Sequence, residues 1–394
     1  MPDVIPLNDL MRANAPIRSE LDREIGRVLD SGWFLRGRQV ESFEEEWADY
    51  CGQKFCITCN SGTDALTLAA AALDISETSV QSNTSALTPI GLHRGGARIR
   101  IVDVLDDGRT GPELKNAVPV LLFGRAPSAA EARHRIFDAA HAHGWRPFAH
   151  ATACWSFYPT KTLGSLGDGG AVTTNDPAAA GLMRDLCGRD DRFKDGRQIT
   201  SRMDEIQAAV LRIKLKYLPS WLEQRREIAM RYRALLPPCA QLIADSRDDL
   251  HHLLVIRVEQ RDQLQAYLSS HGVETKVHFP KPLHQLDGPW SDQFRQLPTA
   301  ERWCRSILTL PCFPGLKETE IAYVADLIAG FYESSARHQE RNPVTNGMAP
   351  QGLPCPAGKT LSFDGFSDAP CQPSLRTADA QYYRYKLTER GVAK

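Results

Sequence analysis

Short apolar segments alternate with helical segments along much of the chain, and no other sequence feature restricts the fold as strongly. Apolar runs that predict short buried strands occur at 54–58, 99–102, 118–123, 135–137 and 171–174. Apolar residues at helical spacing predict helices at 17–30, at 43–50 and at 65–73. Strands that alternate with helices predict an α/β fold with a mostly parallel sheet covered on both faces.

The later part of the chain predicts a second, smaller α/β unit. Apolar spacing from Met203 to Tyr217 predicts a helix that Pro219 ends, with a long amphipathic helix through Leu235 and a hinge between the parts. The elements expected beyond it are a strand at 253–258, a helix ended by Gly272, an extended run at 273–279 and a helix at 321–331. We predict a large domain at 1–230 that carries the N-terminal helices, a small C-terminal domain at 231–335, and an irregular tail at 336–394.

Charge balance and apolar patterning exclude several classes of protein. The 394 residues hold 47 Lys and Arg against 48 Asp and Glu, so no net positive field favours nucleic acid or an anionic membrane. The longest apolar run, at 65–73, is far shorter than the roughly 18 residues that span a membrane. The N-terminus also lacks the pattern of a signal peptide. We therefore expect a soluble protein without a nucleic-acid or membrane partner.

The cysteines indicate a reducing compartment. Ten cysteines without a repeated metal-ligand spacing are typical of reduced thiols in the cytoplasm. Cys56 and Cys59 form one CxxC pair, but no second pair at zinc spacing accompanies it. We expect a cytoplasmic protein without a metal site.

The segment CNSGTDAL places polar residues between a predicted strand and a predicted helix. Ser61, Gly62 and Thr63 would offer hydroxyls and backbone N–H groups at the helix N-terminus, where the helix dipole favours an anion. This arrangement indicates a phosphate cradle. The alternative is that Ser61 or Thr63 only caps the helix.

Asp138 ends an apolar strand in the segment RIFDAAHAHG. The carboxyl edge of a parallel sheet is where such sheets bind ligands, and a carboxylate there can hold a ring nitrogen in its protonated form. The alternative is an N-cap for a helix that begins at Ala139. His141 follows three residues later, with a catalytic and a structural role both open.

Lys161 lies between an aromatic strand end, Trp155 to Tyr158, and a glycine-rich stretch, 164–170. A buried ammonium is costly, and the usual remedies are a lowered pKa or a Schiff base with an aldehyde. Ser156 is a second candidate phosphate ligand. The alternative is that Lys161 grips a phosphate directly.

One ligand would explain all three segments. Pyridoxal phosphate needs a phosphate cup, an acid that keeps its pyridine nitrogen protonated, and a lysine for its aldehyde. Ser61, Asp138 and Lys161 supply that set, so we expect pyridoxal 5'-phosphate as the cofactor of the large domain.

Motifs over most of the chain, from about residue 5 to residue 331, point to one known family. The matching segments are VLDSG at 28–32, NSGTDAL at 60–66, DAAH at 138–141, SFYP with Lys161, GDGGAV at 167–172, SRMDEIQAA at 201–209, HFP at 278–280, His284 and LTLP at 308–311. In these segments the chain resembles the DegT/DnrJ/StrS family of pyridoxal-phosphate nucleotide-sugar aminotransferases. The resemblance implies the fold type I aminotransferase architecture, with a large domain and a smaller C-terminal α/β domain.

The resemblance also implies roles for individual residues. Lys161 would be the aldimine lysine and Asp138 the pyridinium partner. The implied phosphate ligands are Gly62, Thr63 and Ser156, and His141 would lie against the cofactor ring. Candidate substrate residues are Phe34, Arg202, His278 and His284, where Arg202 would pair with a diphosphate or a donor carboxylate, or else form an interface salt bridge.

The implied reaction moves an amino group from an amino acid, glutamate by preference, to the keto carbon of a nucleotide-linked deoxysugar. The family shares its active site between two subunits, so a homodimer is expected. Two positions depart from the family pattern. Ser85 stands where an aromatic ring usually stacks on the cofactor, and Thr200 stands where an Asn usually reaches the phosphate across the dimer interface.

Two rival functions remain at this stage. A catalytically impaired member that acts as a cofactor-binding regulator or scaffold would agree with Ser85 and Thr200, whereas the retained pair of Lys161 and Asp138 opposes it. A sugar dehydratase of the same family would carry a histidine in place of Lys161.

Overall fold

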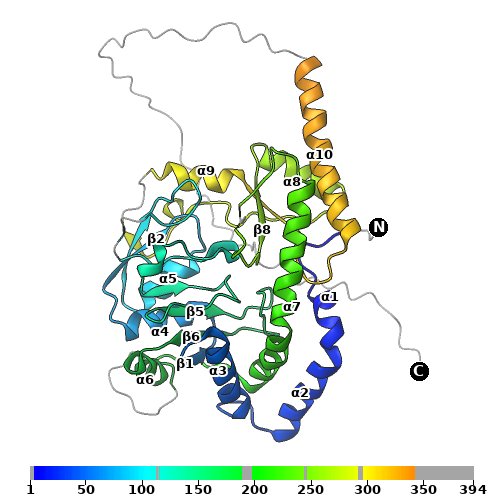
Figure 1. Ribbon diagram of the computed structural model, residues 1–394. Helices are drawn as coiled ribbons and strands as arrows, with labels where there is room; N and C mark the ends of the chain where they lie inside the picture. Colours follow the sequence, from blue (N-terminus) through cyan, green and yellow to red (C-terminus); the bar gives the residue numbers. More distant parts are fainter. Residues whose placement is uncertain are drawn as a thin grey trace, which may run out of the picture. The chain divides into compact units, whose positions relative to one another are not determined.

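The computed structural model describes residues 4–111, 114, 116–188, 198–243, 246–291 and 296–341 (Figure 1). By internal contacts, the chain divides into one unit at 1–342 and another at 343–394. The predicted tail lies outside the described residues from 342 onward. Its first residues are not irregular as expected, because helix α10 (Glu318–Arg341) continues through them.

Three helices open the chain: α1 (Leu10–Asn14), α2 (Arg18–Ser31) and α3 (Arg38–Cys51). The last two confirm the helices predicted at 17–30 and 43–50. Gly32 and Gly52 follow them with φ of 63° and 69°, the left-handed conformation that ends a helix and that glycine adopts at little cost. Helix α3 begins on the Glu205 carboxylate, which accepts the N–H groups of Gly37, Gln39 and Val40.

A mixed, mostly parallel sheet forms the centre of this part. Its strands are β1 (Phe55–Cys59), β2 (Glu77–Gln81), β3 (Arg98–Val102), β4 (Ile136–Asp138), β5 (Thr152–Ser156), β6 (Gly170–Thr174) and β9 (Trp290–Ser291). Strand β4 pairs in parallel with β5, and β3 pairs in parallel with β2 and β9, whereas β6 runs antiparallel between β1 and β5. Parallel bridges from Ser79 to Ala117 and from Val120 to Asp138 join the two groups of strands.

The run at 118–123 departs from its predicted strand. Only its first half pairs, and its end turns into a short 3-10 helix at Leu122–Gly124, where Phe123 has a φ of 66°. The other 3-10 helices are Ala15–Ile17, Glu131–Arg133 and Leu283–Gln285.

Helices cover both faces of the sheet, as predicted. Cys154 of β5 lies in one core with α4 (Gly62–Ala72) and α6 (Pro177–Leu186), while its neighbours Ala153 and Trp155 lie in another core with α3. Successive side chains of a strand point to opposite faces, so strands buried on both sides need the continuous apolar runs seen here. Helix α5 (Leu87–Arg94) packs beside α4.

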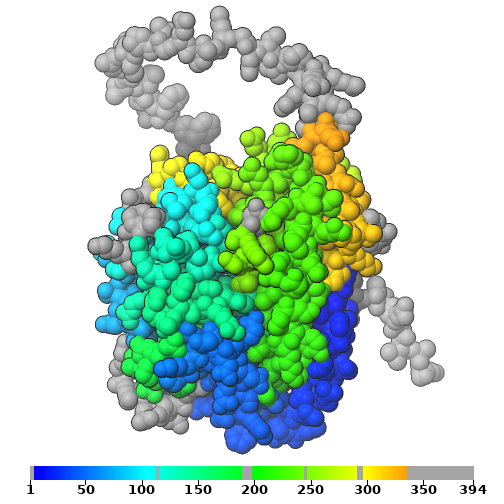
Figure 2. Space-filling model, in the orientation of Figure 1, coloured from blue at the N-terminus to red at the C-terminus, as the bar shows by residue number. Residues whose placement is uncertain are grey.

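Helix α7 (Glu205–Leu235) corrects the prediction that Pro219 ends a helix and creates a hinge. The helix continues through Pro219, although a proline inside a helix removes one hydrogen bond and costs about 3 kcal/mol. Leu218 and Trp221, on either side of it, are buried in two different cores, and this packing offsets the cost. Helices α2 and α3 pack along α7, and their blue surfaces adjoin its green surface in Figure 2.

The remaining elements surround a separate core. Strands β10 (Ile307–Leu310), β8 (Leu254–Arg257) and β7 (Gln241–Leu242) form an antiparallel sheet. It packs with α8 (Arg261–Ser270) and α10, and α9 (Pro298–Ser306) precedes β10. The extended run predicted at 273–279 pairs with its neighbours through isolated bridges at Val273 and Lys276. The boundary between a large and a small domain stays a prediction.

No helix in the described part of the chain is long and apolar enough to cross a bilayer. Across the same residues, no group of three or more His, Cys, Asp and Glu side chains is arranged to hold a metal ion.

The buried ring of His143 makes the fold sensitive to acid. It lies among Trp47, Trp155 and Phe157, and burial lowers its pKa to about 3. An unfolded chain protonates this ring near pH 6.5, so between these values the unfolded state binds more protons and stability falls as the pH falls. We expect His143 alone to reduce the free energy of unfolding by about 2 kcal/mol between pH 7 and pH 5.

Urea unfolding of His143→Phe and the wild type across this range tests the expectation. The variant should lose less stability toward pH 5 than the wild type does. His150→Gln is the control, because His150 is exposed, and its pH dependence should follow the wild type. Equal slopes for His143→Phe and the wild type would contradict the assignment.

Candidate active site

One edge of the sheet collects most of the residues singled out by sequence. Parallel strands β4 and β5 end there with Asp138 and Ser156, while β6 begins there at Gly170 because it runs the other way. Gly170 pairs with Cys59, the last residue of β1, so the N-terminus of α4 reaches the same edge. Strand direction alone therefore brings segments from four parts of the sequence together.

The N-terminus of α4 and Ser156 form a tight cradle. A Cβ added to Gly62 would lie 2.7 Å from the Ser156 Cβ, and one added to Gly170 would lie 2.3 Å from the Ser61 carbonyl carbon, so both contacts require glycine. The Ser61 hydroxyl accepts the Asp64 N–H, which makes Ser61 the helix cap that was the alternative interpretation.

The cap leaves donors free for an anion. The Ser61 hydroxyl still has its own proton to donate, and the N–H groups of Gly62 and Thr63 lie in the first turn, where no intrahelical acceptor exists. The hydroxyl of Ser156 accepts the Tyr158 N–H at 3.4 Å and likewise keeps its proton. Capping and phosphate binding are therefore compatible at this helix end.

Asp138 is buried, and the structure places no helix after it, which removes the N-cap alternative. Its carboxylate accepts the Thr88 hydroxyl at 2.7 Å and the Ala140 N–H at 3.1 Å. Burial raises the pKa of Asp138, while these two hydrogen bonds and the Lys161 ammonium oppose the rise. The hydrogen bonds and the nearby ammonium thus favour the charged form of a carboxyl group that burial disfavours.

Lys161 lies within electrostatic range of Asp138 without a direct ion pair between them. Lys161 as a whole residue is partly exposed, but its ammonium is desolvated, and no described residue makes a hydrogen bond to that ammonium. Desolvation lowers the pKa of Lys161 to about 8, with Asp138 acting in the opposite direction. A substantial fraction of this amine is therefore neutral, and nucleophilic, near neutral to mildly alkaline pH.

Two histidines share the surroundings of Lys161. The Nδ1 atom of His141 accepts the Phe123 N–H at 3.2 Å, and burial together with the Lys161 ammonium lowers the pKa of His141 well below its usual range. His278 bonds to the Thr309 hydroxyl at 2.9 Å, and burial, Lys276 and Lys161 lower its pKa to about 3. Both rings are neutral at physiological pH.

The candidate substrate residues Phe34, Arg202 and His284, and the two positions that depart from the family pattern, differ in exposure and contacts. Phe34 and Thr200 are exposed, and Arg202 is partly exposed with no ion pair to a described residue. The ring of His284 is buried and fixed between Ser82 at 2.8 Å and Glu301 at 3.1 Å, so it presents no free face to a ligand. The Ser85 hydroxyl accepts the Leu87 N–H.

Sequence reasoning missed two residues that contact this constellation. Thr88 comes from α5 and bonds to Asp138, and His252 packs against His141 with ring centroids 4.5 Å apart. Neither position carried a signal that a single sequence reveals, because both contacts join segments more than 40 residues apart.

These features define a class. A mostly parallel α/β sheet carries, at one edge, an anion cradle, a buried carboxylate and a desolvated lysine, and this donor set fits a phosphorylated aldehyde with a basic ring nitrogen. The comparisons with known proteins agree. A model of the DegT/DnrJ/EryC1/StrS aminotransferase family matches residues 16–108 and 131–329, and the chain belongs to this family.

Individual relatives span most of the chain. It is 36% identical to the erythromycin biosynthesis sensory transduction protein EryC1 of Saccharopolyspora erythraea, covering 83% of this chain and 99% of that protein. It is 35% identical to a dTDP-3-amino-3,4,6-trideoxy-alpha-D-glucose transaminase of Streptomyces venezuelae, with 84% and 96% covered. The crystal structure of S. venezuelae DesV with a ketimine intermediate aligns with a TM-score of 0.78 and 34% identity, over 84% of this chain and 99% of that chain.

Fold and cofactor follow from this membership. The chain has the fold type I architecture of pyridoxal-phosphate sugar aminotransferases, and pyridoxal 5'-phosphate is its cofactor. The resemblance noted from the sequence motifs is confirmed.

Thr88→Val should impair the enzyme by removing the hydrogen bond to the Asp138 carboxylate. A hydrogen bond to a charged group contributes about 1.5–3 kcal/mol, so we expect aminotransferase activity to fall roughly tenfold to hundredfold. The pKa of Asp138 should rise, which moves the acid limb of the pH–rate profile to higher pH. Thr88→Ser keeps the hydroxyl and serves as the control; an unchanged profile for Thr88→Val would contradict the assignment.

Proposed function

We propose that this protein transfers an amino group from glutamate to the keto carbon of a nucleotide-linked deoxysugar. The observation that carries the proposal is the desolvated Lys161 beside the buried Asp138, in a chain whose relative in Streptomyces venezuelae is named as a dTDP-amino-sugar transaminase. An amine and an acid arranged in this way serve a reaction, whereas a simple binding protein has no use for them.

Individual residues receive roles in this proposal. Ser61, Gly62, Thr63 and Ser156 hold the phosphate of the cofactor, and Asp138 holds its ring nitrogen. His141 would contact the cofactor ring. Pyridoxal phosphate, when bound, supplies an aldehyde that combines with amines and a ring that accepts electron density.

Lys161 has two tasks. Its neutral amine would hold the aldehyde of the cofactor, and when the donor amine takes that place the freed amine would serve as the base that accepts the Cα proton of the donor. A pKa of about 8 suits both tasks, because the amine is free to accept a proton and its ammonium is acidic enough to give it up. The carboxylate of Asp138 would favour transfer by holding a proton on the ring nitrogen of the cofactor.

Arg202, His278 and Phe34 are proposed to contact the sugar nucleotide. Arg202 is a cation without an ion pair among the described residues, one residue after Ser201, which bonds to Asp64 of helix α4. A guanidinium in this place suits a diphosphate or the donor carboxylate. His284 was also a candidate. Its ring is buried and bonded to Ser82 and Glu301, which favours a structural role for this residue.

Lys161→Ala tests the proposal. Removing the nucleophile and base should reduce the formation of 2-oxoglutarate from glutamate and a keto sugar nucleotide by about three orders of magnitude. The long-wavelength absorbance that wild-type protein develops with pyridoxal phosphate should also be lost. Lys161→Arg keeps a cation but not the neutral amine, and it should be equally inactive.

A variant at 161 that retains full activity and absorbance would overturn the assignment. Wild-type protein that binds the cofactor but moves no amino group to any keto sugar would instead favour the regulatory alternative.

We also propose that the enzyme is a homodimer with shared active sites. Four exposed apolar residues, which we call the α7-entry patch, surround the first turn of α7: Trp33, Phe34, Leu35 and Leu166. Their backbones meet this turn through Leu35 with Asp204, Phe34 with Glu205 and Leu166 with Gln207. Neighbouring exposed apolar groups favour a protein contact. The exposed Thr200 precedes the first turn of α7 by a few residues, and we propose that it contributes to the active site of the partner subunit.

A double charge substitution in the α7-entry patch tests the dimer. Leu35→Asp with Leu166→Glu should convert the dimer to a monomer in sedimentation analysis and weaken cofactor binding. Met230→Glu is the matched control, because Met230 is as exposed but lies more than twenty residues further along α7. A wild-type monomer, or a double variant that stays dimeric, would refute the proposed interface.

A cytoplasmic location completes the proposal. Its support is the set of free cysteines, seven of the eight described ones buried, in a chain that uses an intracellular cofactor and substrate.

A further inference from the structure

One stretch of the chain departs from its family at the site itself. The family model matches residues up to 108 and again from 131, so 109–130 lies outside the matched ranges. This stretch contains the turn 122–126, where Phe123 and Gly124 adopt φ of 66° and 88°. The left-handed conformation is unfavourable for phenylalanine, so the surroundings must hold it in place.

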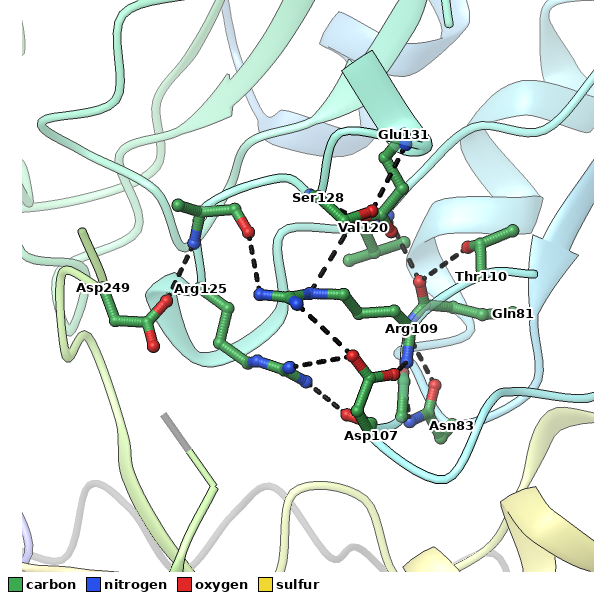
Figure 3. A network of polar contacts seen from close by, with 12 residues as sticks. Gln81, Asn83, Asp107, Arg109, Thr110, Val120, Arg125, Ser128, Glu131 and Asp249 are labelled. Carbon is green, nitrogen blue, oxygen red and sulfur yellow. Dashed lines mark hydrogen bonds and ion pairs between the residues drawn. The ribbon is translucent and has the colours of Figure 1, made fainter. Parts of the chain in front are cut away.

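A polar network holds this turn from two sides (Figure 3). On one side, Arg125 donates to the Asp107 carbonyl and carboxylate, and Arg109 donates to Asp107 and to the Ala126 carbonyl. On the other side, the Asp249 carboxylate accepts the Ala126 N–H at 3.0 Å.

Backbone contacts complete the clamp. The N–H groups of Leu250 and Leu253 donate to the carbonyls of Gly124 and Phe123 at 2.7 and 3.2 Å. A Cβ on Gly124 would lie 2.8 Å from the backbone nitrogen of His252, so the close approach of segment 249–253 requires glycine at position 124.

The clamped turn directs one N–H group at the site. The N–H of Phe123 donates to Nδ1 of His141 at 3.2 Å. A nitrogen that accepts a hydrogen bond carries no proton, so the proton of the neutral ring is on Nε2. The charged and titratable groups around His141 are Lys161, His278, His143 and His252, and burial with these neighbours disfavours a second proton.

His252 supports the same ring from segment 249–253. Its ring centroid lies 4.5 Å from that of His141, and its Nδ1 lies 3.2 Å from the hydroxyl of Thr162, the residue after Lys161. The buried guanidinium of Arg225 donates to the carbonyls of His251 and His252 and so fixes their backbone.

We propose that the turn 122–126, clamped by Asp107 and Asp249, and the ring of His252 together form a positioning device that fixes His141 as the neutral, Nε2-protonated imidazole. His252 is a positioning residue in this device, and it also links His141 to the lysine-bearing segment through Thr162. The device rests on contacts of the protein alone, so it can be tested apart from the proposed reaction.

The test measures the tautomer of His141 by nitrogen NMR in cofactor-free protein with labelled histidine, assigned through His141→Gln. Wild-type protein should show one neutral tautomer with the proton on Nε2. Asp249→Ala and His252→Ala should each add signal from the Nδ1-protonated form and weaken pyridoxal-phosphate binding about threefold to tenfold. His252→Phe keeps the ring contact and should stay nearer to the wild type in tautomer.

Asp176→Ala is the matched control, because Asp176 also binds two backbone N–H groups, at the start of α6 away from the site. It should lose comparable stability without changing the tautomer. If Asp249→Ala does not fold, Arg125→Gln loosens the same turn from the Asp107 side. An unchanged Nε2-protonated form in both the loosened turn and His252→Ala would overturn the device, whereas inactivity of wild-type enzyme toward keto sugars would leave the tautomer result intact and count only against the proposed function.

Discussion

The desolvated ammonium of Lys161 is the constraint on which the site depends. An amine removed from water beside a single buried carboxylate is destabilised as a cation, and its pKa falls to about 8. The fold maintains this costly arrangement with bonds that belong to other elements. Thr88 from α5 and the Ala140 N–H donate to the Asp138 carboxylate, the anion whose charge acts on Lys161, and they favour its charged form against burial.

Close backbone packing forms the anion cradle at the same edge of the sheet. Gly62 and Gly170 let the start of α4 lie directly against the ends of β5 and β1, which a single methyl group on either would prevent. The N–H groups of the first helical turn and the hydroxyls of Ser61 and Ser156 therefore lie at the same edge of the sheet. The start of α4 thus provides a positive potential at this edge.

Local patterns in the sequence predict much of this. Short local patterns predict the strand that ends at Asp138, the small-residue helix after Ser61 and the glycine-rich segment after Lys161. A resemblance to a known family assigns all three to one site. Contacts between distant segments do not appear in a single sequence. Thr88 and His252 reach the site from α5 and from the segment before β8, and Pro219 fails to break α7 because buried neighbours on both sides outweigh a local penalty.

The stretch 109–130 shows how a site can survive a local departure from its family. Arg109, Arg125 and a turn with two residues of positive φ lie in this stretch, and Asp107 and Asp249 hold the turn from outside it. The turn brings one backbone N–H to His141. A backbone N–H suits this purpose because it does not titrate near physiological pH and has no side-chain rotamer to change. The segment that contains it can therefore vary in length and composition, provided that something clamps the turn. Here Asp107 clamps the turn from one side and Asp249 from the other, and His252 supports the His141 ring. Since Asp249 and His252 precede β8 of the C-terminal sheet, the proposed device links the imidazole at the sheet edge to the packing of the later part of the chain.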